Sequence, residues 1–250
     1  MIRRPPRSTL SSSSAASDVY KRQLVLCITI DWEAYVNASE PTYCSGLRAT
    51  YGTRYCGSSS SLGMETVRKE NKSKRLSMSH TAVNEKSSII VKNLLALKYL
   101  DEGNHVAAFY SFQNEPDTKN LIEHLWSKEK EVFLPVTHEG SLKFFNYHSD
   151  SQLIENRFGI YEPDTSQNEE IHIQSLDIIL IPLVAFDRSC NRIGMGSGFY
   201  DKALSVLDAS LSETHLIGLA YDFQKMEHIK PNKWDIPLDC VVTEKKVYHS

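Results

Sequence analysis

The sequence lacks an apolar segment long enough to cross a lipid bilayer. Its longest apolar runs, residues 24–30 and 178–186, have the length of strands. The five cysteines form no C-x-x-C pair, and the histidines show no spacing typical of a zinc site. An odd number of cysteines and no recognisable signal peptide favour free thiols in a reducing compartment. We therefore expect a cytoplasmic protein without a membrane partner.

The sequence also lacks a large excess of charge of either sign. Its net charge is −3, but residues 1–80 carry 12 basic and 6 acidic residues, whereas residues 81–250 carry 16 basic and 25 acidic residues. An acidic body is unfavourable for general binding to the phosphate backbone of nucleic acids. We expect a monomer whose partners are small molecules rather than nucleic acid.

The first 63 residues lack the apolar periodicity of helices or strands. Residues 8–17 are almost entirely Ser, Thr and Ala, and residues 58–61 are all Ser. Residues 1–17 contain three arginines and no acid, which resembles an organellar transit peptide, but the apolar face of an amphipathic helix is missing. A second interpretation is that residues 1–23 are translated adapter sequence and that Met64 is the natural start. We favour this interpretation and predict a poorly structured extension over residues 1–63.

From Val67 onward the pattern alternates between helices and strands. Apolar residues at helical spacing predict a helix over residues 89–100, capped by Ser77 or Ser79 and ended near Gly103. Further helices are expected over residues 117–126 and 199–211, strands over 105–112, 131–135, 142–147, 176–185, 215–221 and 241–243, and a loop over 159–171. The apolar run over 176–185 is typical of a central parallel strand. Residues 64–250 are thus predicted to form a single α/β domain, with a mostly parallel central sheet and helices on both faces.

Glycine is sparse, with 11 residues in the chain, yet Gly194, Gly196 and Gly198 lie close together. Glycine lets the backbone approach a ligand, and the start of the helix that follows attracts anions. Arg192 adds positive charge to the same segment. The pattern fits neither G-x-G-x-x-G nor a Walker loop, because no Gly-Lys-Ser/Thr follows. A phosphate-binding loop is therefore favoured over a flexible turn.

Three acids and one tyrosine are candidate binding residues. Each could instead have a purely structural role. Asp201 and Asp235 are candidate Mg²⁺ ligands, although Asp201 equally suits the first turn of a helix, and Asp235 suits a turn. Glu115 follows a predicted strand, where it would accept N–H groups of a heterocycle or simply be solvated. Tyr110 is a stacking surface or part of the core.

The basic run over residues 68–75 is normally a solvated helix face. It would contribute to the site only if it folded over the phosphates.

Four segments in order, residues 109–118, 133–136, 181–202 and 234–237, resemble the 5-formyltetrahydrofolate cyclo-ligases. The resemblance implies an enzyme of one-carbon folate metabolism that uses ATP and Mg²⁺. Such an enzyme converts 5-formyltetrahydrofolate to 5,10-methenyltetrahydrofolate and releases ADP and phosphate. The formyl oxygen attacks the γ-phosphate, and N10 then closes the ring as phosphate leaves. The alternative is a module of the same fold that binds nucleotide or folate without turnover.

The resemblance also implies roles for individual residues. ATP would contact Arg68, Arg192, Ile193, Gly194, Met195, Gly196, Ser197, Gly198, Phe199 and Tyr200. The folate would contact Tyr110, Glu115, Gly196, Ser197, Gly198, Phe199 and Tyr200. Arg192 and Tyr200 would act in catalysis, and Asp201 and Asp235 would hold Mg²⁺.

One position departs from the family pattern. Many members carry a lysine four residues before an N-terminal arginine, and both contact ATP. If Arg68 is that arginine, Met64 occupies the position of the lysine. Lys72, Lys74 or Arg75 would then take over its role.

Overall fold

The computed structural model describes residues 61–207 and 213–250, all within one compact unit. Almost all of the predicted extension therefore lies outside the described residues. The helices are α2 (Ser61–Leu76), α3 (His80–Leu95), α4 (Lys98–Glu102), α5 (Lys119–Ser127) and α6 (Phe199–Leu204), with 3₁₀ turns η2 (Ile173–Ser175) and η3 (Asp222–Gln224). None of the helices in the described ranges is both long and apolar enough to span a bilayer.

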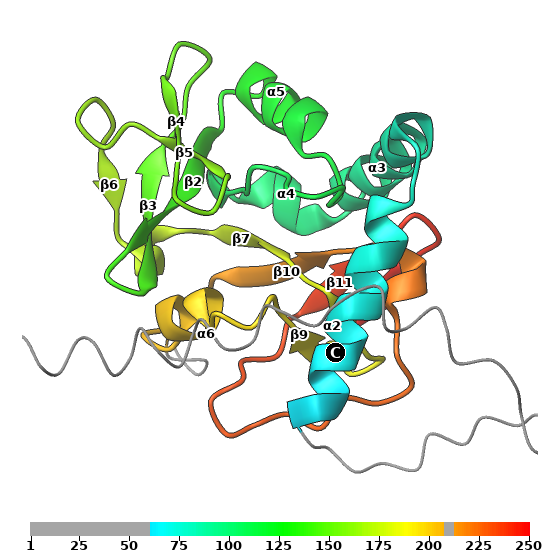
Figure 1. The fold of residues 1–250 in the computed structure, drawn as a ribbon. Helices are drawn as coiled ribbons and strands as arrows, with labels where there is room; N and C mark the ends of the chain where they lie inside the picture. The colour runs from blue at the N-terminus through cyan, green and yellow to red at the C-terminus, as the bar shows by residue number, and fades with distance from the viewer. Residues whose placement is uncertain (1–60, 208–212) are drawn as a thin grey trace, which may run out of the picture. The chain divides into compact units, whose positions relative to one another are not determined.

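The predicted central sheet is confirmed. Its strands are β1 (His105–Ala107), β2 (Glu131–His138), β3 (Ser141–Asn146), β6 (Glu170–Ile171), β7 (Ile178–Pro182), β10 (His215–Leu219), β11 (Cys240–Val242) and β12 (Val247–His249). They lie in the order β12-β11-β10-β7-β1-β2-β3-β6 (Figure 1). The strands from β11 to β2 are parallel, and β12, β3 and β6 add antiparallel edges. Two small antiparallel pairs join β4 (Leu153–Glu155) to β5 (Tyr161–Pro163) and β8 (Ala185–Phe186) to β9 (Arg192–Ile193).

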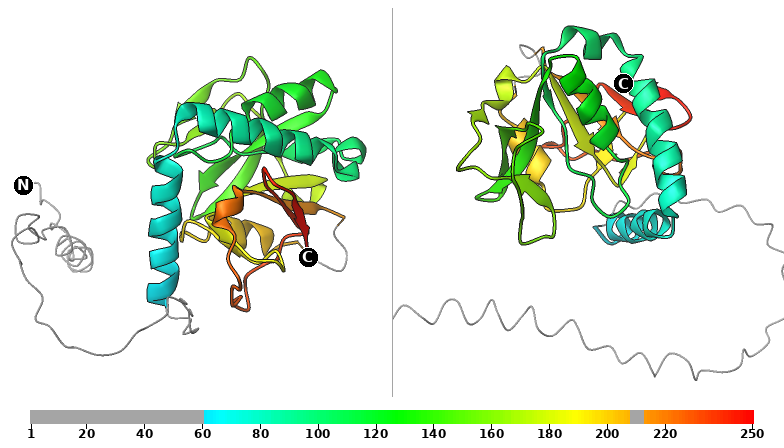
Figure 2. Two further views of the ribbon diagram at one scale, coloured as in Figure 1. Left: turned by 90° about the vertical axis from the view of Figure 1, so that its right-hand side faces the viewer. Right: turned by 90° about the horizontal axis from the view of Figure 1, so that it is seen from above.

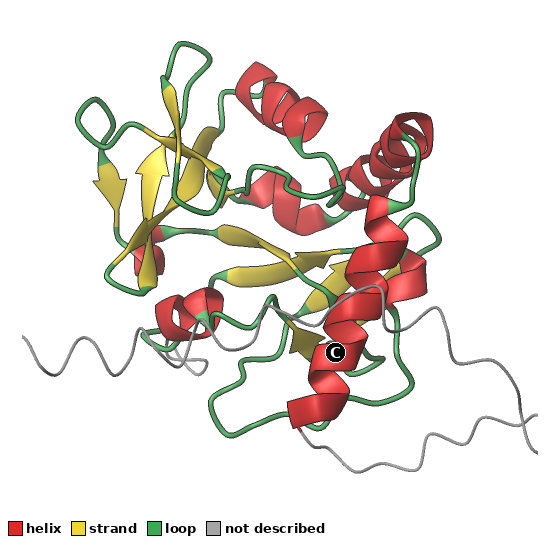
Figure 3. Ribbon diagram, in the orientation of Figure 1, coloured by secondary structure: helices red, strands yellow, loops and turns green. Residues whose placement is uncertain are grey.

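Alternation along β7 divides the core into two layers. Ile178 and Leu180 belong to the cluster that packs against α3, α4 and α5, whereas Ile179 and Ile181 belong to the cluster that includes Leu204 of α6. Successive side chains of a strand point to opposite faces, so a strand covered on both sides is apolar throughout. Helices therefore cover both faces of the sheet, as predicted (Figure 3).

The helix predicted over 89–100 is interrupted: α3 covers its first part and ends at Leu95, and α4 begins at Lys98. The hydroxyl of Ser79 accepts a hydrogen bond from the backbone N–H of Ala82 and caps α3. Val83, Ile90 and Leu94 are buried. Gly103 ends the short helix α4 that follows.

Several elements differ from the predictions. The strand expected over 105–112 ends at Ala107, and the chain turns further on at Gln113 and Asn114, which adopt positive φ angles. The predicted loop over 159–171 contains β5 and β6, which are too short for a recognisable period. Helix α6 ends at Leu204 rather than at 211, and β12 was not predicted.

The basic run is not a uniformly solvated face. It forms α2, which meets α3 at residues 77–79 and runs in a different direction (Figure 2). Arg68 and Asn71 lie on its inner side, and Arg75 is buried with 1% of its area exposed. The prediction of solvation holds for Lys69 and Lys74, which are exposed, and is wrong for Arg75.

Candidate active site

The candidate site lies at the carboxyl edge of the parallel strands, where ligands of such sheets bind. The β8–β9 hairpin carries the chain from the end of β7 to the glycine-rich segment. The buried carboxylate of Asp187 accepts hydrogen bonds from the backbone N–H groups of Ser189, Asn191 and Ile229. These bonds fix the hairpin from which the loop emerges.

The glycine-rich segment, residues 194–198, forms an exposed loop that opens directly into α6. Gly196 has φ +106° and Gly198, the N-cap of α6, has φ +66°. Residues with a Cβ rarely adopt such angles, so glycine is required here for conformational reasons. The first N–H groups of a helix have no partner within the helix. The loop and the start of α6 are therefore suited to an anion.

Arg68 of α2 reaches across to this loop. Its Nε donates to the carbonyl oxygen of Gly194 at 2.9 Å, and a Cβ at position 196 would lie 3.5 Å from its Cζ. One turn further along, Asn71 donates from Nδ2 to the carbonyl oxygen of Val184 at 3.1 Å. The inner side of α2 thus brings a cation to the glycine-rich loop.

Arg192 links the other side of the loop to the segment that contains Asp235. Its guanidinium forms an ion pair with Asp201 at 2.5 Å and donates to the carbonyl oxygen of Ile236. Burial lowers the pKa of Arg192, whereas the charges of Asp201 and Asp235 raise it. The structure thus brings Arg192 together with both predicted metal ligands.

Glu115 lies at the carboxyl end of β1, beside α2. Its Oε1 accepts from Nη1 of Arg75 at 3.2 Å, and its Oε2 accepts from the backbone N–H of Phe112 at 3.3 Å. Burial raises the pKa of Glu115, and the charge of Arg75 and the N–H of Phe112 oppose that shift. Glu115 is therefore a buried carboxylate rather than a solvated loop acid.

Tyr200, in the first turn of α6, is influenced by the charges of both groups of residues. Burial is the main cause that raises its pKa; the charge of Glu115 raises it further and that of Arg192 lowers it. Its hydroxyl is buried without a hydrogen-bond partner in the described residues. Tyr200 is thus a neutral donor close to both the glycine-rich loop and Glu115.

An aromatic group that the sequence did not predict connects Tyr110 to α6. Tyr161 contacts Tyr110 with ring centroids 5.4 Å apart, and Phe158 contacts Phe199 with centroids 5.9 Å apart. Tyr110, Phe158 and Tyr161 are each about two-fifths exposed, so they lie at the surface rather than in the core. The β4–β5 hairpin supplies Phe158 and Tyr161. The available signal was an aromatic residue just before the predicted loop and another near its start, on either side of Gly159.

Comparison with known proteins identifies the family of this chain. A family model described as the 5-formyltetrahydrofolate cyclo-ligase family matches residues 61–244. The chain belongs to this family. The Escherichia coli K12 5-formyltetrahydrofolate cyclo-ligase is 44% identical over 146 residues, which cover 57% of this chain and 79% of that protein. The cyclo-ligase of Haemophilus influenzae is 34% identical over 177 residues, covering 70% and 94%.

A solved structure supports the same family. The NMR structure of Aquifex aeolicus 5,10-methenyltetrahydrofolate synthetase matches with a TM-score of 0.65 and 32% identity, covering 74% of this chain and 92% of that one. The family match begins at Ser61, where α2 begins, and includes every candidate site residue.

At the position where the cyclo-ligase pattern has a lysine, this chain has an apolar contact. Met64 and Val67 pack with Met226 against a small buried cluster of Ala185 and Ile193, to which Ile229 also belongs. Met64 therefore helps to attach α2 to the β8–β9 hairpin.

Proposed function

We propose that this protein catalyses the ATP-dependent cyclisation of 5-formyltetrahydrofolate to 5,10-methenyltetrahydrofolate, with release of ADP and phosphate. The observation that carries the proposal is the double contact of α2. The helix touches the glycine-rich loop through Arg68 and the buried acid Glu115 through Arg75. A phosphate site and an acceptor for a heterocycle therefore lie along one helix.

ATP is proposed to bind at residues 192–200. The backbone N–H groups of the glycine-rich loop and the start of α6 would receive the phosphates, and Arg68 would neutralise their charge. Arg192 is committed to Asp201 and Ile236, so its role is to hold the loop against the 232–236 turn and add positive charge nearby. Phosphoryl transfer depends mainly on such positioning and charge neutralisation.

The folate is proposed to bind between Glu115 and the aromatic group. Glu115 would accept the N–H donors of the reduced pterin ring, whereas Tyr110 and Phe158 would supply aromatic contacts. Tyr200 and residues 196–199 would contact both substrates, because they lie between the two sites.

The chemistry then needs two steps. The formyl oxygen attacks the γ-phosphorus, the bond to ADP breaks, and the formyl carbon becomes activated as a phosphoimidate. N10 attacks that carbon, loses its proton, and phosphate leaves with the former formyl oxygen. The contribution of this chain is to align the formyl oxygen with the phosphate and to stabilise the transferred charge through Arg68, Arg192 and the loop N–H groups.

Mg²⁺ is proposed to bind between the ATP phosphates and two carboxylates. No group of three or more His, Cys, Asp or Glu side chains in the described ranges is placed to hold a metal. Asp201 uses Oδ1 for Arg192, and Asp235 uses Oδ2 for Asn232, so each carboxylate has a second oxygen for a ligand. Two carboxylates completed by phosphate oxygens fit the coordination habits of Mg²⁺. The ion would neutralise phosphate charge during transfer.

We further propose that residues 64–250 carry the activity as a monomer of the cytoplasm. The thiols of Cys190 and Cys240 are free and buried, which supports a reducing compartment. A chain that starts at Met64 should retain full activity, and size-exclusion chromatography tests the monomer.

The deciding experiment is an absorbance assay on the purified full chain. With Mg-ATP and 5-formyltetrahydrofolate, the near-ultraviolet absorbance of the methenyl product should rise, and it should not rise without ATP. Asp201→Ala should abolish the increase, whereas Lys69→Ala, a matched surface change, should not. Thermal stabilisation by ATP or folate without product would instead support the binding module.

A further inference from the structure

We infer that Arg75 is a positioning residue that holds the Glu115 carboxylate in place and aimed at the ring N–H groups of the folate. The inference rests on the proposed function, because it assigns Glu115 to the folate. It concerns a residue that the sequence pattern placed on a solvated helix face.

The geometry joins these residues through both side chain and backbone. Arg75 and Glu115 form an ion pair at 3.2 Å, with 1% and 8% of their side-chain areas exposed. Asn114, next to Glu115, donates from Nδ2 to the carbonyl oxygens of Arg75 and Met78 at 2.9 and 3.2 Å. The N–H of Phe112 binds the second carboxylate oxygen. The orientation of Glu115 is therefore fixed from α2 and from its own loop.

The state of the pair indicates a function beyond packing. Nε and Nη2 of Arg75 are buried without hydrogen-bond partners among the described residues. A buried guanidinium with unpaired N–H groups is costly, and apolar side chains often replace a buried ion pair without loss of stability. A position that served packing alone would be filled more favourably by leucine or methionine.

Arg75 on α2 is the positive charge that pairs with the Glu115 carboxyl. The charge of Glu115 acts on the phenol of Tyr200 on α6, and the charge of Arg75 acts on the phenol of Tyr221. Burial raises the pKa of both phenols, so neither supplies a charge near neutral pH. Without the guanidinium, only the N–H of Phe112 would oppose the effect of burial, so the pKa of Glu115 would rise further and protonation would become easier. A protonated carboxyl has one oxygen fewer to accept the N–H groups of the folate.

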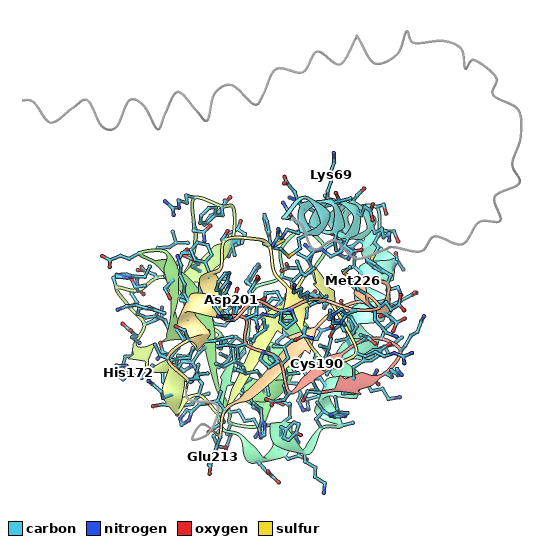
Figure 4. The ribbon with its side chains drawn as sticks, turned by 90° about the horizontal axis from the view of Figure 1, so that it is seen from below. Lys69, His172, Cys190, Asp201, Glu213 and Met226 are labelled. Carbon is cyan, nitrogen blue, oxygen red and sulfur yellow. The ribbon has the colours of Figure 1, made fainter. Side chains whose placement is uncertain are left out.

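The test compares Arg75→Met, Arg75→Lys, Glu115→Gln and the double variant Arg75→Met/Glu115→Gln in the full chain. Lys69→Met is the matched control, because Lys69 lies on the same helix and points away from the rest of the molecule (Figure 4). The measurements are KM for 5-formyltetrahydrofolate and for ATP, the pH dependence of kcat/KM, and calorimetric binding of 5-formyltetrahydrofolate without ATP.

Arg75→Met should raise the folate KM about 10-fold to 100-fold, the effect of one hydrogen bond to a charged group. The ATP KM should stay within about 2-fold, and kcat/KM should recover as the pH rises and Glu115 ionises. Arg75→Lys should restore most of the folate affinity. Because Arg75 acts through Glu115, Arg75→Met should add no further loss once Glu115 is glutamine.

An unchanged folate KM in Arg75→Met, an equal rise in both KM values, or additive losses in the double variant would overturn the inference. If Arg75→Met does not fold, Arg75→Gln takes its place, and misfolding of both assigns Arg75 to structure alone. Failure of the proposed function is distinguishable. In that case the wild type binds folate without turnover, and Arg75→Met still weakens calorimetric binding. A wild type that binds no folate overturns both.

Discussion

Arg68 donates a hydrogen bond to the carbonyl oxygen of Gly194, a residue 126 positions further along the chain. This contact places the first described helix against the loop that follows the central strand. The positive charge of Arg68 and the N–H groups of the loop consequently face the same region. The proposed phosphate site would therefore combine two distant parts of the sequence.

Replacing Arg68 by alanine should weaken ATP binding selectively. Loss of a charged hydrogen-bond donor should raise the ATP KM about 10-fold, with little change in the folate KM. Steady-state kinetics with each substrate varied in turn measures both values. Lys69→Ala should leave both unchanged, and equal effects of the two substitutions would contradict the role of Arg68.

Gly196 and Gly194 provide a matched pair within the loop. Gly196→Val places a β-branched side chain at φ +106° and near the Arg68 guanidinium, so the loop should lose its conformation and ATP binding should fall at least about 10-fold. Gly194 has no positive φ, and a Cβ there would meet nothing within 4 Å, so Gly194→Ala should bind ADP nearly normally. Titration calorimetry with Mg-ADP compares them, and thermal unfolding checks that both variants fold.

The aromatic group should act on folate rather than on ATP. Phe158→Ala removes a ring that contacts Phe199 and carries the Arg157 guanidinium over its face at 4.8 Å. We expect the folate KM to rise about 5-fold to 50-fold, the usual range for an aromatic contact. Ile154→Ala, an exposed apolar residue of the same hairpin, is the control. A rise confined to the ATP KM would show that the hairpin serves the nucleotide instead.

Titration of Glu115 should make the free energy of unfolding depend on pH. Its pKa is raised in the folded protein above the ordinary value of 4.5, so the folded state holds its proton more tightly than the unfolded state. Its contribution to the free energy of unfolding is complete below about pH 4.5 and is lost as the pH rises through the folded pKa. Urea unfolding between pH 4 and 8 should show the difference between wild type and Glu115→Gln declining with pH. Glu123→Gln, an exposed acid on α5, should give a flat difference.

The central sheet and the glycine-rich loop were predictable because their signals are local. The apolar run of Ile178–Pro182 reflects burial on both faces, and the glycines at 196 and 198 reflect backbone angles. The role of Arg75 was not predictable. Its partner Glu115 lies 40 residues further along the chain. The sequence of a polar helix does not indicate which of its charged residues is buried.

The aromatic group shows the same limit. Phe158 follows a three-residue strand, and so short an element has no period that separates it from a loop. The contact between the rings of Phe158 and Phe199 depends on the position of the β4–β5 hairpin relative to α6. That placement is a property of the folded chain rather than of either segment.

Helix α2 is attached to the rest of the domain largely by polar contacts. Asn71 and the two arginines on either side of it are bonded to three different segments. Among the side chains of α2 that the structure describes, Met64 and Val67 pack against a buried apolar cluster. Few apolar contacts make local detachment of an element inexpensive. Amide hydrogen exchange in α2 should therefore be faster than in α3 and should slow when either substrate is added. Since both substrates favour the docked helix, each should increase the affinity of the protein for the other by the same factor.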